Sequence, residues 1–422
     1  MAELIEIDEA LEYVLKHFHP LDAEEVDILE ALDRVLAEDI YSGVDVPPFD
    51  NSAMDGYALQ AADTIGASAE EPVYLRVMAD LAAGYISQVR VSSGTAARIM
   101  TGAPVPAGAD AVVRFEDTSE GLRRGPKPGE GTIGIFKEVK PGHNVRLAGE
   151  DIKRGSLVIP QGTTIRPQEI GVLASLGRAA VKVIRRPRVA ILATGDELVD
   201  IGEEVAPGKI RNSNEYCNAA LVKRYGGIPV RLGIARDSAQ DLTAKIREGL
   251  QQQVDLFITS AGVSVGDYDM VKNVLAAEGE MHFWQVRIKP GKPLAFGLIQ
   301  GVPLLGLPGN PVSAVVAFEV FARPAILKML GKKWLAKPTV HAILEEEVTN
   351  SGRRHFMRAV VRKEDGRYYV TTKGSGVRVQ GSGILTSLVW ANSLLVVPED
   401  VTRIEAGQEV EVQMLDWPEE VF

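Results

Sequence analysis

The sequence is poor in cysteine and in long apolar stretches. Cys217 is its one cysteine, which permits no internal disulfide and no cysteine metal cluster, and fits a reducing compartment. No apolar run approaches the roughly 18 residues that a membrane span needs. The N-terminal stretch has acids at helical spacing and lacks the basic start and apolar core of a signal peptide. We therefore expect a soluble, cytoplasmic protein that does not interact with membranes.

An excess of basic residues is also missing. The 46 lysine and arginine side chains are outnumbered by 57 aspartate and glutamate side chains, giving a formal net charge of −11. A protein that coats nucleic acid normally has the opposite balance, so we expect no nucleic-acid partner. The 422 residues exceed what one hydrophobic core usually organises, and two to four domains are expected.

The first part of the chain predicts helices followed by a small β domain. Residues 4–18 have the spacing of an amphipathic helix. Asp22 followed by Glu25 resembles the capping box that starts a helix. Between about residues 45 and 140, short apolar runs are broken by proline and glycine, which is typical of a small β domain. Short apolar runs separated by turn residues return after Gly331 and predict a second β domain at the C-terminus.

The segment from Arg188 to Gly331 has a different pattern. The apolar runs RVAILAT, IPVRLGIA, VDLFITS and PLLGL alternate with helical stretches. This alternation predicts a parallel sheet with crossover helices, a doubly wound α/β domain. The runs are almost continuously apolar, as expected when both faces of the sheet are covered.

Polar loops follow each of these predicted strands. Ligands of a doubly wound sheet bind outside the carboxyl ends of the strands, so the four loops at 194–198, 235–238, 260–269 and 306–311 should share one edge. Helix starts in the same loops would attract anions, and the acids beside them would need a cation. The combination predicts a phosphate-bearing ligand held with Mg²⁺. The acids are Asp196, Glu197, Asp237, Asp267 and Asp269.

Each loop also has a purely structural interpretation. Asp267 can serve only as a helix cap, and the other loops can be ordinary turns. For any single loop we favour that interpretation, whereas four such loops at one edge favour a ligand site.

Two further motifs lie outside these loops. Lys289 and Lys292 flank a Pro-Gly turn and suit a terminal phosphate or an oxyanion, although turn lysines are usually solvated. The stretch VPPFDNSAMDGYAL contains Asp55 and also Asp50 and Asn51, either of which can form an Asx turn instead. Thr101 lies in a glycine-proline loop of the same β domain.

Six motifs in a fixed order resemble one family. PPFDNSAMDGYA, TGAPVPAGADAVV, ATGDEL, TSAGVSVGDYD, IKPGKPLAFG and GLPGNPVSA are similar to those of the molybdopterin molybdenumtransferases, which include bacterial MoeA and the E domain of gephyrin. The resemblance runs from about residue 5 to the C-terminus. It implies a doubly wound, mostly parallel molybdopterin-binding domain with two smaller β-rich domains and an elongated linker domain. The implied limits are 1–24 for an N-terminal helix packed on the α/β domain, 25–45 and 140–184 for the linker domain, 46–139 for the first β domain, 185–331 for the α/β domain, and 332–422 for the C-terminal β domain.

The reaction implied by the resemblance is the last step in making the molybdenum cofactor. Molybdate, or tungstate, enters the dithiolene of adenylylated molybdopterin, and Mg²⁺-dependent hydrolysis of the adenylate releases AMP and molybdenum cofactor. The resemblance also implies a homodimer, and a contact with molybdopterin adenylyltransferase fits the shared substrate. In the family dimer, Asp55 and Thr101 approach the α/β domain of the partner subunit.

Site residues follow from the matching motif positions. The catalytic residues implied are Asp55, Thr101, Glu197, Asp237, Asp269, Lys289 and Lys292, of which Glu197, Asp237 and Asp269 would bind Mg²⁺. Asp267 remains an alternative to Asp269 as the metal ligand. The implied cofactor-binding residues are Thr194, Gly195, Ser260, Gly262, Ser264, Gly266, Pro308, Gly309, Asn310, Pro311, Ser313, Arg353 and Ser382, the last two as oxyanion contacts.

Two other functions compete with this one. Molybdopterin adenylyltransferase has a fold similar to residues 185–331, but that shorter enzyme would not need the AMDGY domain or the C-terminal β domain. A scaffold protein is the second alternative, because the gephyrin E domain also clusters receptors. No long linker or fused partner domain supports it here.

Overall fold

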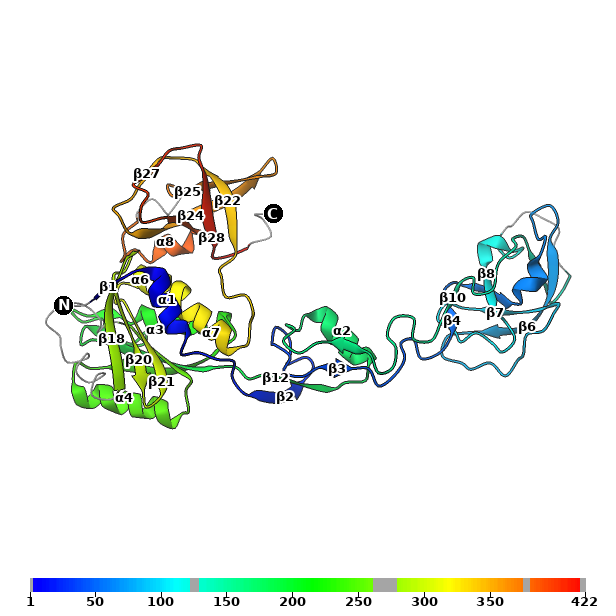
Figure 1. Cartoon of the computed structure of the whole chain (residues 1–422), viewed down its shortest axis with the longest axis horizontal. Helices are drawn as coiled ribbons and strands as arrows, with labels where there is room; N and C mark the ends of the chain where they lie inside the picture. Colours follow the sequence, from blue (N-terminus) through cyan, green and yellow to red (C-terminus); the bar gives the residue numbers. More distant parts are fainter. Residues whose placement is uncertain (1–2, 122–128, 261–278, 375–379, 418–422) are drawn as a thin grey trace. The chain divides into compact units, whose positions relative to one another are not determined.

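The computed structural model describes residues 3–121, 129–260, 279–374 and 380–417, and its elements are labelled in Figure 1. These residues divide into two compact units. The first consists of 1–26, 33–37 and 182–422, and the second of 27–32 and 38–181. Among the described residues, no helix is both long and apolar enough to cross a bilayer.

A seven-stranded sheet forms the centre of the first unit. Its strand order is β1-β18-β20-β21-β17-β13-β16. The four strands that were predicted to be parallel are parallel, and β20 is antiparallel to both of its neighbours. The predicted doubly wound, mostly parallel fold is therefore confirmed. The strands are β1 (Glu3–Ile5), β13 (Arg188–Thr194), β16 (Ile228–Ala235), β17 (Leu256–Ser260), β18 (Gly279–Val286), β20 (Pro293–Ile299) and β21 (Val302–Leu307).

Helices cover both faces of this sheet, as the apolar strands require. One face packs on an apolar core that contains residues of α1, α3, α6, η3 and α7, including Val222, Val312 and Phe318. The other face packs on Leu242 and Ile246 of α4. Helix α4 lies on the opposite side of the sheet from α1 and α7 in Figure 1. The helices are α1 (Ile7–Leu15), α3 (Ser213–Arg224), α4 (Ala239–Gln251), α6 (Pro311–Ala317), the π-helical turn η3 (Phe318–Ala322) and α7 (Arg323–Met329).

The C-terminal part of the first unit is a β-barrel. Strand order β24-β25-β22-β28-β26 closes on itself because β26 also pairs with β24. The short strand β19 pairs in parallel with the start of β24 and joins the barrel to the segment that follows β18. The elements are β19 (Ile288–Lys289), β22 (Thr339–Leu344), β23 (Val348–Thr349), β24 (Arg354–Glu364), β25 (Arg367–Thr371), α8 (Thr386–Val389), β26 (Ser393–Val397), β27 (Arg403–Ile404) and β28 (Glu409–Met414).

The second unit contains a five-stranded sheet in the order β8-β5-β7-β6-β9. Its elements are β5 (Gly56–Leu59), β6 (Val73–Leu81), β7 (Thr95–Ile99), β8 (Ala111–Arg114), β9 (Thr132–Ile135), η1 (Ala61–Thr64), η2 (Phe115–Asp117) and α2 (Pro167–Ser175), with the short pairs β4 (Asn51–Ser52) and β10 (Val145–Arg146), and β3 (Ile40–Tyr41) and β11 (Leu157–Ile159). The limits between the two units fall within β2 (Ala23–Asp27) and β12 (Ala180–Ile184).

The helix predicted after Asp22 is wrong. Residues Ala23–Asp27 form a strand, followed by turns. Glu24 pairs with Arg34, which also donates a hydrogen bond to the carbonyl of Ile184 at 2.8 Å. Pairing of β2 with β12, which lies more than 150 residues later in the chain, therefore outweighs the local capping signal. The helix predicted at 4–18 is present but shorter, because β1 occupies Glu3–Ile5.

Gly56 provides a test of the packing of the five-stranded sheet. A Cβ atom on Gly56 would lie 2.0 Å from the Val113 carbonyl oxygen of β8. We expect Gly56→Ala to lower the free energy of unfolding of the second unit by about 2 kcal/mol or more, because two strands would have to separate. Urea unfolding followed by circular dichroism measures the change.

Gly171 in α2 is the matched control in the same unit, because a Cβ atom there meets nothing within 4 Å. Gly171→Ala should raise the unfolding free energy by about 0.5–1 kcal/mol. Equal effects of the two substitutions would contradict the close approach of β5 and β8.

Candidate functional site

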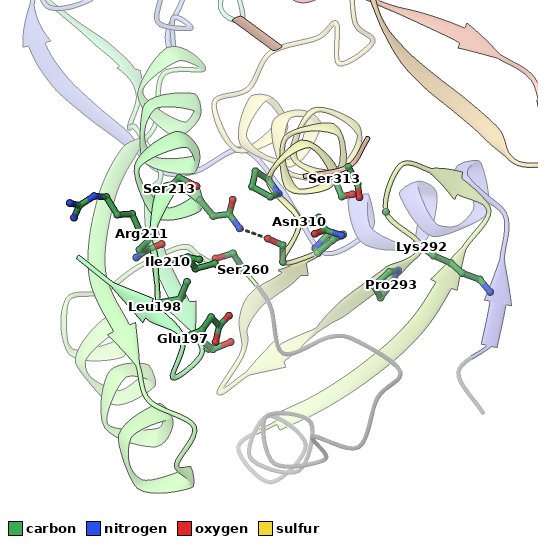
Figure 2. A pocket seen from close by; sticks show the side chains of 18 residues that line it. Glu197, Leu198, Ile210, Arg211, Ser213, Ser260, Lys292, Pro293, Asn310 and Ser313 are labelled. Atoms are coloured by element: carbon green, nitrogen blue, oxygen red, sulfur yellow. Dashed lines mark hydrogen bonds between the residues drawn. The ribbon is translucent and has the colours of Figure 1, made fainter. Parts of the chain in front are cut away.

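A pocket of about 580 Å³ lies at the carboxyl ends of β13, β17 and β21 (Figure 2). The sequence analysis predicted a ligand site at this edge of the sheet. Glu197 and Lys292 lie on opposite sides of the pocket. Ten of the predicted site residues line it, namely Thr194, Glu197, Ser260, Lys292, Pro308, Gly309, Asn310, Pro311, Ser313 and Ser382.

The acidic side of the pocket depends on a glycine. Gly195 has a φ of +138°, and a Cβ atom there would lie 2.3 Å from Oε2 of Glu197. The missing side chain leaves space for the Glu197 carboxylate, which is exposed at the pocket. Gly195 therefore acts through the placement of Glu197 and is not itself among the lining residues.

Asp237 is fixed by a reciprocal contact with Asp196. The backbone N–H of Asp237 donates to Oδ1 of Asp196 at 3.2 Å, and the N–H of Asp196 donates to Oδ2 of Asp237 at 3.3 Å. These bonds tie the loop after β16 to the loop after β13. Asp237 does not line the pocket. Within the described ranges, no three His, Cys, Asp or Glu side chains gather closely enough to hold a metal ion. The third predicted ligand, Asp269, lies outside those ranges, as do Asp267, Gly262, Ser264 and Gly266.

Residues before α3 form a wall of the pocket that the sequence analysis missed. Asn212 caps α3 by accepting a hydrogen bond from the N–H of Glu215, and its amide donates to the Glu215 carboxylate at 2.6 Å. The amide of Asn214 donates to the carbonyl of Gly309 at 2.8 Å, the dashed line in Figure 2. The run RNSN before a helix is a detectable N-cap signal.

The lysine turn packs directly on α6. Gly291 has a φ of +85°, and a Cβ atom there would lie 2.8 Å from Cβ of Ser313. The turn therefore requires glycine, and this close contact fixes Lys292 beside the start of α6. Lys292 lines the pocket, whereas Lys289 belongs to β19 and pairs with His355 of the barrel.

The barrel contributes Ser382 to the pocket. The carbonyl of Ser382 accepts a hydrogen bond from the N–H of Val312 in α6 at 3.0 Å. Arg358, completely buried, donates to the neighbouring carbonyl of Gly381 and to Oγ of Ser387, both at 3.1 Å. Burial lowers the pKa of Arg358 to about 10.

Arg353 does not line this pocket, and its guanidinium donates to the carbonyl of Ile288 at 3.3 Å. Arg353 was expected from the resemblance of the stretch SGRRHFMR to the family, whereas Arg358, five residues later in the same stretch, lies within β24.

Known proteins are similar in sequence to this chain over almost its whole length. Three family models match in sequence order, described as "MoeA N-terminal region (domain I and II)" at residues 5–177, "Probable molybdopterin binding domain" at 190–328 and "MoeA C-terminal region (domain IV)" at 341–415. The molybdopterin molybdenumtransferase of Haemophilus influenzae is 37% identical over 97% of this chain and 98% of its own length. The chain belongs to the molybdopterin molybdenumtransferase family.

Other relatives agree with this membership. The molybdopterin molybdenumtransferase of a Nostoc species is 39% identical over 93% of this chain and 89% of its own. The crystal structure of the molybdopterin biosynthesis MoeA protein of Pyrococcus horikoshii is 32% identical, covers 98% of this chain and 100% of its own, and superimposes with a TM-score of 0.80. The family resemblance found in the motifs is confirmed over almost the whole chain.

Asp55 and Thr101 of this family member lie in the second unit. Oδ1 of Asp55 accepts hydrogen bonds from both the N–H of Thr101 at 2.7 Å and its hydroxyl at 2.8 Å. These two bonds lower the pKa of Asp55. Asp50 does not form the alternative local turn through its Oδ1, which instead accepts a hydrogen bond from the N–H of Ala148 at 2.7 Å.

His355 lies next to the cationic part of the barrel. Its ring is 3% exposed, and Nδ1 has no hydrogen-bond partner. Burial, with smaller effects of Lys289, Arg358 and Arg353, lowers the pKa of His355 to about 3. The imidazole is therefore neutral in the folded protein at neutral pH, and three cations lie near this neutral ring.

His355 predicts an acid-dependent loss of stability. Its ordinary pKa is 6.5, so between pH 6.5 and about 3 the unfolded chain binds a proton that the folded chain does not. Stability should fall as the pH decreases below 6.5, by up to about 1.4 kcal/mol per pH unit, with no contribution from His355 above that pH. Urea unfolding at pH 7, 6 and 5 should show a shallower pH dependence for His355→Gln than for the unmodified protein. Identical slopes would contradict the buried neutral ring.

Proposed function

We propose that the protein inserts molybdate into adenylylated molybdopterin, hydrolyses the adenylate, and releases AMP and molybdenum cofactor. The pocket carries this proposal, because it gathers polar groups from three strand ends, the start of α6 and the barrel in one cavity. The full-length similarity to molybdopterin molybdenumtransferases supports it over the shorter adenylyltransferase. The substrates are molybdopterin, as its adenylate, and molybdate, with tungstate as an alternative oxyanion.

The residues of the pocket suit different parts of such a substrate. The Ser313 hydroxyl at the start of α6 and the Lys292 ammonium group suit phosphate or oxyanion oxygens. Ser382 and the cationic side of the barrel suit molybdate, and we propose that Arg358 contributes to that side by holding the Gly381–Ser382 loop. Lys289 acts from β19, where it adds positive charge beside His355.

Mg²⁺ fits the acids that the structure describes. Magnesium takes oxygen ligands, usually one or two carboxylates together with substrate phosphates and water. Glu197 presents a carboxylate at the pocket, and Asp237 follows the neighbouring strand. We propose that these two residues, with Asp269, hold Mg²⁺, which would neutralise charge on the phosphates.

Further proposals concern assembly and location. We propose a cytoplasmic homodimer in which Asp55 and Thr101 serve the α/β domain of the partner subunit, and a contact with molybdopterin adenylyltransferase for transfer of the adenylate. We also propose the domain limits that the family resemblance implies, including 185–331 for the α/β domain and 332–422 for the C-terminal β domain.

A single-turnover assay tests the proposed reaction. Purified protein is mixed with adenylylated molybdopterin and Mg²⁺, and AMP release is followed with molybdate, with tungstate and with neither. We expect AMP release to depend on an oxyanion. Tight binding of the adenylate without AMP release would instead indicate a carrier or scaffold.

The acids can be tested in the same assay. Glu197→Gln keeps the size of the side chain and removes the charge, and we expect AMP release to slow by about 100-fold or more, as when one electrostatic catalytic group is lost. Circular dichroism should show an unchanged fold. Glu204→Gln is the control, because Glu204 is exposed in the same segment and does not line the pocket. A normal rate for Glu197→Gln would remove this residue from the mechanism.

The two arginines can be distinguished by their dependence on molybdate. We expect Arg358→Lys to raise the half-saturating molybdate concentration by about 10-fold, because lysine cannot make both hydrogen bonds of the guanidinium fork. Arg353→Lys should change it less than about twofold. The reverse order would assign the oxyanion contact to Arg353.

A further inference from the structure

A helical path leads away from the pocket to the start of the barrel. Helix α6 begins at the pocket, continues through the π-helical turn Phe318–Ala322 and ends as α7 at Met329. The segment 332–338, which we call the barrel linker, then leads into β22. Figure 1 shows α7 and the following segment below the barrel strands. The π turn is notable because such turns often occur at functional positions.

Glu319 in this turn is the centre of a buried polar cluster. Its side chain is 3% exposed. Both carboxylate oxygens accept hydrogen bonds from the hydroxyl of Tyr225, at 2.8 and 2.9 Å, and Oε2 also accepts one from Nζ of Lys337 at 2.5 Å. The side chain of Lys337 is only 6% exposed. Burial lowers the pKa of Lys337, and the Glu319 carboxylate opposes that shift.

Arg323 holds the same linker one helical turn later. Its guanidinium donates to the carbonyl of Leu335 at 2.9 Å and to that of Ala336 at 3.3 Å. Side chains of η3 and α7 therefore hold three consecutive linker residues, 335–337. The same guanidinium lies 5.3 Å from the centre of the Tyr225 ring.

A buried ion pair of this kind adds little net stability to a core. Removing two charges from water costs several kcal/mol per ion, and apolar residues of similar size often serve a core equally well. What the ion pair provides is one defined position, because Lys337 must meet Glu319 for either charge to be accommodated. That position sets where the linker leaves α7 and where the barrel begins.

The start of the same helical path, at the pocket, also contacts the barrel. Val312 of α6 donates its N–H to the carbonyl of Ser382, which lines the pocket. Val312 is the second residue of α6, so its N–H has no acceptor within the helix. The barrel is thus attached to one continuous helical path at both ends, through the linker and through the Ser382 loop.

We propose that Glu319 and Lys337 form a latch that positions the barrel so that Ser382 completes the pocket. Both residues lie outside the pocket lining, and they are positioning residues. The β19–β24 pairing, the Arg354–Asp8 ion pair and the shared apolar core also hold the barrel, so release of the latch lets the Ser382 loop separate from α6 more often. Each separation breaks the Val312–Ser382 hydrogen bond and weakens the barrel's contribution to oxyanion binding. The part of the pocket built by the sheet is retained. The role in oxyanion binding rests on the function proposed above, whereas the structural role does not.

Three variants of the full chain test the latch. Lys337→Met removes the ammonium group and keeps most of the side-chain volume. The double variant Glu319→Gln with Lys337→Met also removes the buried carboxylate, so no charge is left without its partner. Lys245→Met is the control, because it breaks the partly exposed Lys245–Glu248 pair on α4 of the same unit.

Hydrogen exchange of the Val312 amide is the first measurement, because it requires neither substrate nor turnover. We expect Lys337→Met to increase this exchange rate by about 10-fold or more relative to amides of β17 and of β28. The double variant should recover thermal stability and still show fast exchange, because methionine at position 337 cannot bond to residue 319. A purely structural role predicts that stability and exchange recover together, and that result would overturn the latch, as would unchanged exchange in Lys337→Met.

Oxyanion dependence is the second measurement. In the single-turnover assay, both variants should need about 10-fold more molybdate for half-saturation, while their affinity for AMP stays within twofold of the unmodified protein. An unchanged molybdate requirement alongside fast Val312 exchange would overturn the role in oxyanion binding. Absence of oxyanion-dependent AMP release in the unmodified protein would refute the proposed function, and Val312 exchange would still decide whether the latch exists.

Discussion

The junction between the seven-stranded sheet and the barrel is the constraint on which the pocket depends. Two residues of β19 pair with the start of β24, and one hydrogen bond joins Val312 to Ser382. A parallel sheet supplies loops and helix starts at one edge, but this edge alone is open to solvent. The barrel adds Ser382 and the cationic residues around it from a distant part of the chain. The cavity therefore exists because the sheet and the barrel, which also share an apolar core that includes Phe356 and Leu394, are held together at this edge.

Charge is distributed across this cavity in the way that a charged substrate requires. Glu197 and Lys292 lie on opposite sides of the cavity. Asp196 and Asp237 lie outside its lining, in the loops after β13 and β16, and Lys289 and Arg358 belong to β19 and β24. Phosphate groups with a bound cation and a second anion need both kinds of charge within one site. The low pKa of His355 fits the same scheme, because burial disfavours its charged form and, to a smaller extent, so do Lys289, Arg358 and Arg353.

The sequence predicted those parts of the fold whose signals are local. Continuous apolar runs identified the parallel strands. Interactions between distant residues were not visible. Residues Ala23–Asp27, predicted to start a helix, form β2, which pairs with β12. Arg358 is buried against a carbonyl 23 positions along the chain, and Glu319 meets Lys337 only because a π turn aims it at the linker. Each of these depends on tertiary packing, which single-sequence periodicity cannot report.

We propose that sheet and barrel together form one oxyanion site. Diffraction from crystals soaked in tungstate and AMP tests this most directly, because anomalous scattering locates tungsten independently of the protein atoms. We expect tungsten inside the pocket, within contact distance of Ser382 from the barrel and of Ser313 or Lys292 from the α/β domain. Tungsten bound elsewhere, or held by the α/β domain alone, would contradict it.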